Sequence, residues 1–167
     1  MAHAELHKVL VYRGEPSPDH DPSGHRRNQM QKAEWERDPR VSVTLRPLKY
    51  RYHYDEYGKP ASDPSGKRIV IGTPQEKGVD VLCALAMVRE ARREEVDLVI
   101  LAAQDTDLIP ALDEALLLGT AKIETFSWYE PNKPHGRQQL RPSVRQIWNT
   151  RLRHTDFLNC RDTTDYS

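Results

Sequence analysis

One stretch, from Lys77 to Pro110, constrains the fold of this 167-residue chain more than any other. The residues from Val79 to Val88 are apolar except for Asp80, which predicts a buried helix with one carboxylate near its start. A carboxylate buried alone is costly, so Asp80 should have a partner such as a cation, a metal or the helix N-terminus. The run from Val96 to Ala103 is short, apolar and β-rich, which is typical of a central strand in a parallel sheet.

Two more aspartates come directly after this predicted strand. The sequence continues as Gln104-Asp105-Thr106-Asp107, and a further helix is expected from about Leu108 until Gly119. In open α/β sheets, ligands bind at the carboxyl ends of the strands. Asp105 and Asp107 therefore lie where such folds keep their chemistry.

Composition sets broad limits on the kind of protein. Lys+Arg and Asp+Glu both number 25, so net charge gives no indication for or against nucleic acid. The two cysteines, Cys83 and Cys160, are too few for a disulfide framework. No run of about 18 apolar residues and no signal peptide is present, so we expect a soluble, cytoplasmic protein.

The first half of the chain alternates between strand and helix patterns. We expect a strand at 6–12, a polar helix at about 25–37 capped by Asp21 or Ser23, and a half-exposed strand at 41–54, for which Pro47 indicates either an edge position or a break. A hairpin return is predicted at 67–71. The next helix, which is apolar, starts at either Thr73 or Gly78.

The second half continues the alternation. A strand is predicted at 122–128, a loop at 129–142, and a short helix at 144–152 capped by Ser143. This order of elements predicts an α/β fold with a mostly parallel central sheet flanked by helices. We expect a single domain over residues 1–158, in which 129–158 form a C-terminal extension, and then a polar tail at 159–167.

Two motifs in the chain resemble those of the NYN domain family, which belongs to the PIN-like nuclease superfamily. The family pattern has K-G-x-D at the start of a buried helix, matched here by Lys77-Gly78-Val79-Asp80. A strand then ends in S-G-D-S-D-F-x-P, for which this chain has the residues 103–110. The resemblance covers roughly residues 6–128 and implies a PIN-like three-layer fold.

The resemblance implies a metal-dependent ribonuclease that hydrolyses RNA phosphodiesters with Mg²⁺ or Mn²⁺. Asp80, Asp105 and Asp107 would be the catalytic, metal-binding cluster, with Lys77, Gln104 and Thr106 as substrate-binding candidates. The chemistry of these residues agrees, because hard divalent cations prefer carboxylate oxygens and activate water for attack on phosphorus.

The sequence departs from the family pattern at two places. The family's opening strand carries F-I-D-x-x-N, which has no counterpart here, so one acidic ligand and one central strand are expected to be lacking. Another segment or a second chain would then fill that place, and a homo-oligomer is one way to do so. The second departure is Ala103-Gln104 in place of S-G, which puts the Gln104 side chain at the site.

Other interpretations of the same residues stay open. Asp80 could merely cap its helix, and Asp105 and Asp107 could be a turn plus an N-cap for the helix that follows. The chain could be a catalytically inactive RNA-binding or protein-interaction module on the same scaffold, or D-x-D could bind a sugar nucleotide. Tyr50, Tyr52 and Tyr54 alternate with basic residues, so they face either the core or a single-stranded nucleic acid.

Overall fold

The structure is a computed structural model that describes residues 5–130 and 139–166. The chain has an α/β fold in which the strands form parallel sheets of two and three strands, as the sequence predicts. It forms two compact units, one up to Val79 together with the residues from Asp165, and the other from Asp80 to Thr164. Within the described residues, every helix is too short or too polar to cross a membrane.

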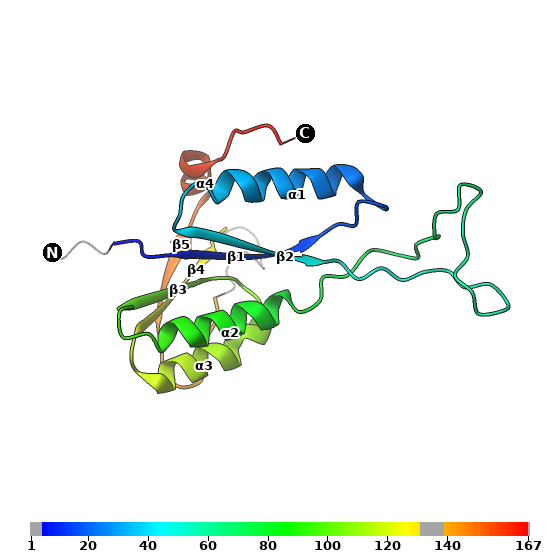
Figure 1. Cartoon of the computed structure of the whole chain (residues 1–167). Helices are drawn as coiled ribbons and strands as arrows, with labels where there is room; N and C mark the ends of the chain where they lie inside the picture. The colour runs from blue at the N-terminus through cyan, green and yellow to red at the C-terminus, as the bar shows by residue number, and fades with distance from the viewer. Residues whose placement is uncertain (1–4, 131–138, 167) are drawn as a thin grey trace. The chain divides into compact units, whose positions relative to one another are not determined.

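The first unit contains a two-stranded parallel sheet and the helix that connects its strands. β1 (Val9–Glu15) pairs with β2 (Val41–Pro47), and α1 (Pro22–Trp35) lies between them in sequence (Figure 1). β1 begins three residues later than the sequence analysis predicts. Of the two predicted caps, Asp21 caps α1, because its carboxylate accepts a hydrogen bond of 2.8 Å from the backbone N–H of Gly24.

The end of α1 is tied to β2 through Glu36. One carboxylate oxygen of Glu36 accepts hydrogen bonds from the Lys32 ammonium at 2.7 Å and from the backbone N–H of Val43 at 2.8 Å. The hydrogen bond from Lys32, and then that from Val43, keeps the pKa of Glu36 below its ordinary value.

The predicted strand at 41–54 is wrong beyond Pro47. Pro47 is the last residue of β2, because proline cannot donate to a ladder and the sequence after it is rich in turn residues. Residues 48–76 instead form an arm that extends beyond the end of β2 (Figure 1). The arm is held by isolated antiparallel bridges, including Lys49 with Gln75 and Tyr52 with Val70, so a return of the chain does occur.

The three tyrosines at the base of the arm do not share one environment. The rings of Tyr50 and Tyr52 lie 4.7 and 5.6 Å from the ring of His20, and both tyrosines are half-buried. Tyr54 is 58 % exposed. A common core-facing row is therefore wrong, because the alternation it requires ends with β2.

The second unit is built on a three-stranded parallel sheet in the order β3-β4-β5. Its strands are β3 (Leu98–Ala102), β4 (Lys122–Trp128) and β5 (Trp148–Leu152). The helices are α2 (Val79–Ala91), the 3₁₀ helix η1 (Thr106–Leu108), α3 (Ile109–Leu118) and α4 (His154–Cys160). α2 begins at the later of the two predicted starts, directly after Gly78, and α3 ends at Gly119, which has φ of 69°.

The predicted helix at 144–152 is wrong, because this segment contains β5. β5 pairs in parallel with β4, from Trp148 opposite Glu124 to Leu152 opposite Trp128. Ser143 does not cap a helix, and its backbone N–H instead donates to the Asp113 carboxylate at 2.7 Å. Pairing with β4 therefore decides the structure of a segment with weak local preference. The predicted loop at 129–142 lies largely outside the described residues.

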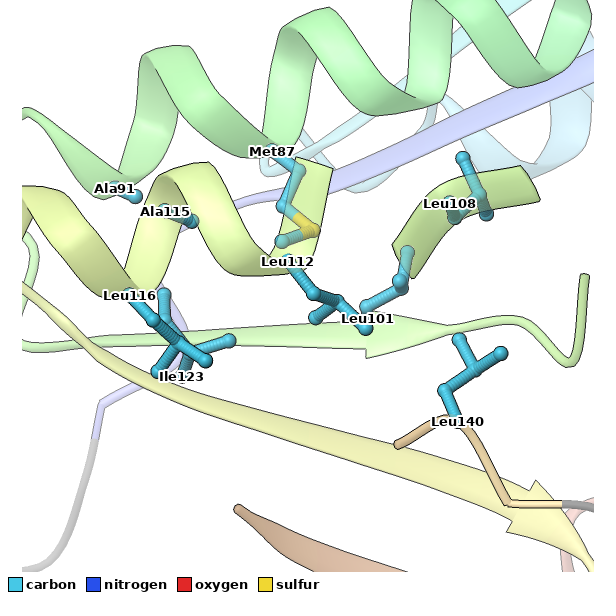
Figure 2. Close-up of a cluster of buried hydrophobic side chains, with 9 residues drawn as sticks. All are labelled: Met87, Ala91, Leu101, Leu108, Leu112, Ala115, Leu116, Ile123 and Leu140. Atoms are coloured by element: carbon cyan, nitrogen blue, oxygen red, sulfur yellow. The ribbon is translucent and has the colours of Figure 1, made fainter. Parts of the chain in front are cut away.

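The core of the second unit lies between one face of this sheet and the helices α2 and α3 (Figure 2). Leu112 of α3 is fully buried there against the sheet, where Leu101 of β3 and Ile123 of β4 are also buried. The expectation of a helix buried all round is wrong for α2, since Val81 and Leu85 are 60 % and 62 % exposed. β3 lies at the edge of its sheet, although its sequence is typical of a central strand.

We predict that Leu112→Ala destabilises the second unit by about 2 to 5 kcal/mol, because it leaves a cavity in a packed core. Leu117→Ala on the same helix is the matched control, since Leu117 is 68 % exposed and its loss should cost less than about 0.5 kcal/mol. Urea unfolding monitored by circular dichroism measures both. Equal costs for the two variants would contradict this core.

We also predict that acid loosens the attachment of α1 to β2. The folded pKa of Glu36 is lowered, so its contribution is complete above the unfolded pKa of about 4.3 and is lost as pH falls through the folded value. Glu36→Gln should remove this part of the pH dependence of Tm, whereas Glu34→Gln should keep it. Identical profiles for the two variants would contradict the role of Glu36.

Candidate functional site

Asp105 lies at the carboxyl end of the sheet, three residues after β3 ends. It is the N-cap of η1, and its Oδ1 accepts a hydrogen bond of 2.9 Å from the backbone N–H of Asp107. This hydrogen bond commits one of its two carboxylate oxygens and fixes the backbone turn. The Asp105 carboxylate is therefore held in place at the strand end.

Asp107 and Thr106 form the first turn of η1, and both side chains are exposed. The next residue, Leu108, is only 2 % exposed and belongs to the core of the second unit. Because Leu108 packs into this core, it fixes the position of the η1 turn, while Thr106 and Asp107 face solvent.

Asp80 reaches the same end of the sheet from α2. A short connection after Ala91 leads into β3, so the helix runs back along the strand that it precedes. Thirteen helical residues span about 20 Å and five strand residues about 16 Å, so the start of α2 lies near the end of β3. This places Asp80, in the first turn of α2, toward the end of the sheet that carries Asp105 and Asp107.

The thiol of Cys83 shows which side of α2 carries the Asp80 carboxylate. Cys83 packs against the core cluster of the second unit, so it lies on the side of the helix that faces the sheet. Burial raises the pKa of the Cys83 thiol, and the negative charge of Asp80 raises it further. Residues three apart are neighbours on a helix, so Asp80 lies near Cys83, but Asp80 is itself exposed, and the expectation of a buried carboxylate is wrong.

Asp105 and Asp107 thus lie at one end of the sheet and Asp80 lies in the first turn of the preceding helix, but the three do not form a metal site. In the described ranges 5–130 and 139–166, no three acidic, histidine or cysteine side chains are grouped so that they could hold a metal ion. The donor chemistry fits Mg²⁺ or Mn²⁺, since Mg²⁺ is commonly held by one or two carboxylates and keeps several waters. Clustered carboxylates also repel each other without a cation.

The three substrate-binding candidates lie in different settings. Gln104 is half-buried, and its side-chain amide donates to the backbone carbonyl of Trp128 at 3.4 Å, which directs it along the strand ends toward β4. Thr106 is exposed beside the two aspartates. Lys77 is exposed just before Gly78, whose φ is 77°, and it belongs to the first unit.

Sequence reasoning missed an open cleft at the carboxyl edge of the sheet, which we call the aromatic cleft. It has a volume of about 940 Å³ and is lined by residues at and beyond the ends of β4 and β5: Trp128, Tyr129, Glu130, Leu152, Arg153, His154 and Phe157. The sequence predicts Trp128 at the end of a strand, but its partners in the cleft come from the end of β5. Since the pattern at 144–152 predicts a helix, no signal in the sequence could place the last residues of that segment beside Trp128.

Comparison of the chain with family models, with curated proteins and with solved structures found no match. The likeness to NYN domains therefore rests on the two motifs in the sequence.

We predict that Asp80→Asn accelerates alkylation of Cys83 by iodoacetamide in a Cys160→Ser background. Removing the negative charge lowers the pKa of the thiol, so more of the reactive thiolate is present at a given pH. Burial is the larger cause of the raised pKa, so the increase should be modest. Glu94→Gln, near the other end of α2, is the control and should leave the alkylation rate unchanged. If Asp80→Asn alkylates at the same rate as the protein that retains Asp80, the Asp80 carboxylate does not lie near Cys83.

Proposed function

We propose that this chain is a divalent-metal-dependent ribonuclease of the NYN/PIN-like type. What supports the proposal is that Asp105 and Asp107 come directly after the carboxyl end of β3, and that Asp80 lies in the first turn of the helix that precedes this strand. Carboxylates from two helices and a strand end could share one hard cation there. Mg²⁺ or Mn²⁺ and RNA are thus the proposed cofactor and partner, and a cytoplasmic location and a homo-oligomer stay predictions.

In this proposal, the carboxylates of Asp80 and Asp107 would be ligands of the metal ion. Asp105 would contribute the carboxylate oxygen that does not cap η1. A bound divalent cation would polarise a phosphoryl oxygen and lower the pKa of a water that attacks phosphorus. Thr106 and Gln104 lie beside the aspartates and would donate hydrogen bonds to the RNA. Lys77 belongs to the first unit and stays a predicted phosphate contact, since its ammonium is a compact point charge.

One observation favours a second candidate, an inactive RNA-binding module on the same scaffold. The described residues contain no ready group of three metal ligands, and Asp105 already serves as a cap. A module that kept the turn and lost hydrolysis would show the same arrangement. Only metal binding and cleavage separate the two functions.

We predict that Mn²⁺ and Mg²⁺ bind saturably in calorimetric titrations and that single-stranded RNA is then cleaved. Asp105→Asn and Asp107→Asn should reduce cleavage by more than the roughly 10- to 100-fold that loss of an outer-shell group costs. Asparagine is itself a good N-cap, so Asp105→Asn keeps the turn and tests the charge alone.

The matched control is Asp97→Asn. Asp97 is an exposed aspartate that precedes β3, at the opposite end of the strand, so it should leave metal binding and cleavage unchanged. Metal binding that survives both Asp105→Asn and Asp107→Asn would contradict the site. RNA binding without any metal-dependent cleavage would favour the inactive module.

A further inference from the structure

Two large aromatic side chains of the aromatic cleft are exposed to solvent. Trp128 is 49 % exposed and Phe157 is 44 % exposed, and both line the same hollow. Large aromatic side chains supply most of the energy at binding surfaces because they combine a wide apolar face with few rotatable bonds. The cleft is therefore a candidate binding surface.

The rings in the cleft are arranged edge to face. The centroids of Trp128 and Phe157 lie 6.3 Å apart with an interplanar angle of 74°, so the edge of one ring meets the face of the other. His154 stacks on Phe157 at 6.2 Å and 28°. Such an arrangement holds the rings in place and suits a flat, unsaturated ligand that stacks on an open ring face.

The charged residues around the rings favour a nucleotide over a plain aromatic ligand. Arg153 and His154 line the cleft, and the Arg151 guanidinium lies 4.9 Å from the ring centroid of Tyr129 next to it. These groups suit contacts to the RNA backbone. Glu130 also lines the cleft, and its negative charge disfavours a phosphate directly beside it.

The cleft adjoins the aspartate turn along the same edge of the sheet. In the parallel register, the last pair of the ladder is Ala102 of β3 with Phe126 of β4, and Gln104 and Trp128 each come two residues later. The hydrogen bond from Gln104 to the Trp128 carbonyl joins these two positions, and Asp105 is the next residue. Adjacent strands lie about 4.8 Å apart, so a chain that lies along this edge would reach both places.

We propose that the aromatic cleft binds a base of single-stranded RNA whose backbone continues to Asp105 and Asp107. The inference rests on the proposed function and adds the substrate class: an unpaired strand, held by stacking next to the point of hydrolysis. Bases in a duplex are stacked on each other and present no free face to Trp128 and Phe157.

The test measures binding of a fluorescently labelled, mixed-sequence single-stranded RNA by anisotropy, in excess EDTA and in an Asp105→Asn background. Trp128→Ala and Phe157→Ala should each weaken binding by roughly 5- to 150-fold, the range for loss of one base-stacking ring. Trp128→Phe should restore most of the affinity, and a duplex of the same sequence should bind much more weakly.

Trp148→Ala is the matched control. Trp148 is 67 % exposed and belongs to the same sheet, but it lies at the beginning of β5, away from the carboxyl edge. Its loss should leave RNA affinity unchanged. Circular dichroism of all variants checks the fold, and Phe157→Ala keeps the test valid if Trp128→Ala does not fold.

Unchanged RNA affinity in folded Trp128→Ala and Phe157→Ala would overturn the inference. Equal binding of duplex RNA would also overturn it, as would a protein dimer that dissociates in these variants without a change in RNA affinity. The binding test uses neither metal nor cleavage, so its failure is distinct from failure of the proposed ribonuclease. Cleft-dependent RNA binding with no metal-dependent cleavage would support the cleft and reject the ribonuclease.

Discussion

The backbone hydrogen bonds between β3, β4 and β5 run in a parallel register, so all three strands end at one edge of the sheet. The turns after the three strands therefore lie along that edge, with Asp105 after β3, Tyr129 after β4 and Arg153 after β5. Burial of the core cluster around Leu112 holds α2 and α3 against the sheet behind this edge. The sheet and its core therefore determine where the turns lie, and the sequences of the turns determine which polar side chains lie there.

The structural and chemical roles of Asp105 are compatible. A carboxylate has about four acceptor positions, and the hydrogen bond from the Asp107 N–H occupies one of them. The cap orients the carboxylate before any ligand arrives, which lowers the entropy cost of binding a cation. Asp80 differs, because its helix begins right after the left-handed Gly78 and its carboxylate lies beside Cys83. For one cation to bind all three carboxylates, the Asp80 side chain and the η1 turn would have to move closer to each other.

The sequence predicts the elements whose own pattern is strong, and it fails where pairing decides. β4 matches its predicted range, and Gly119 ends α3 as expected, because alternation and a left-handed cap are local signals. The pattern of β5 predicts a helix instead, since only contact with β4 selects its structure. Because of this error, the sequence does not predict that the residues at the end of β5 line a cleft together with Trp128. The aspartates are evident because they come directly after a recognisable strand, whereas Phe157 lies in a helix that no pattern indicates.

A chain with equal numbers of acidic and basic residues cannot attract RNA through its overall field. Several of its cations also have acidic partners close by, such as Arg93 with Glu95 at 2.6 Å and Arg40 with Asp38 at 2.6 Å. The proposed recognition of RNA by the second unit would then have to depend on local contacts. The proposed stacking on Trp128 and Phe157 would act at short range and would distinguish an unpaired strand from a duplex, which the overall charge of a protein does not do. If a neutral protein is to select single strands, exposed rings at the strand ends are a physical means to do so.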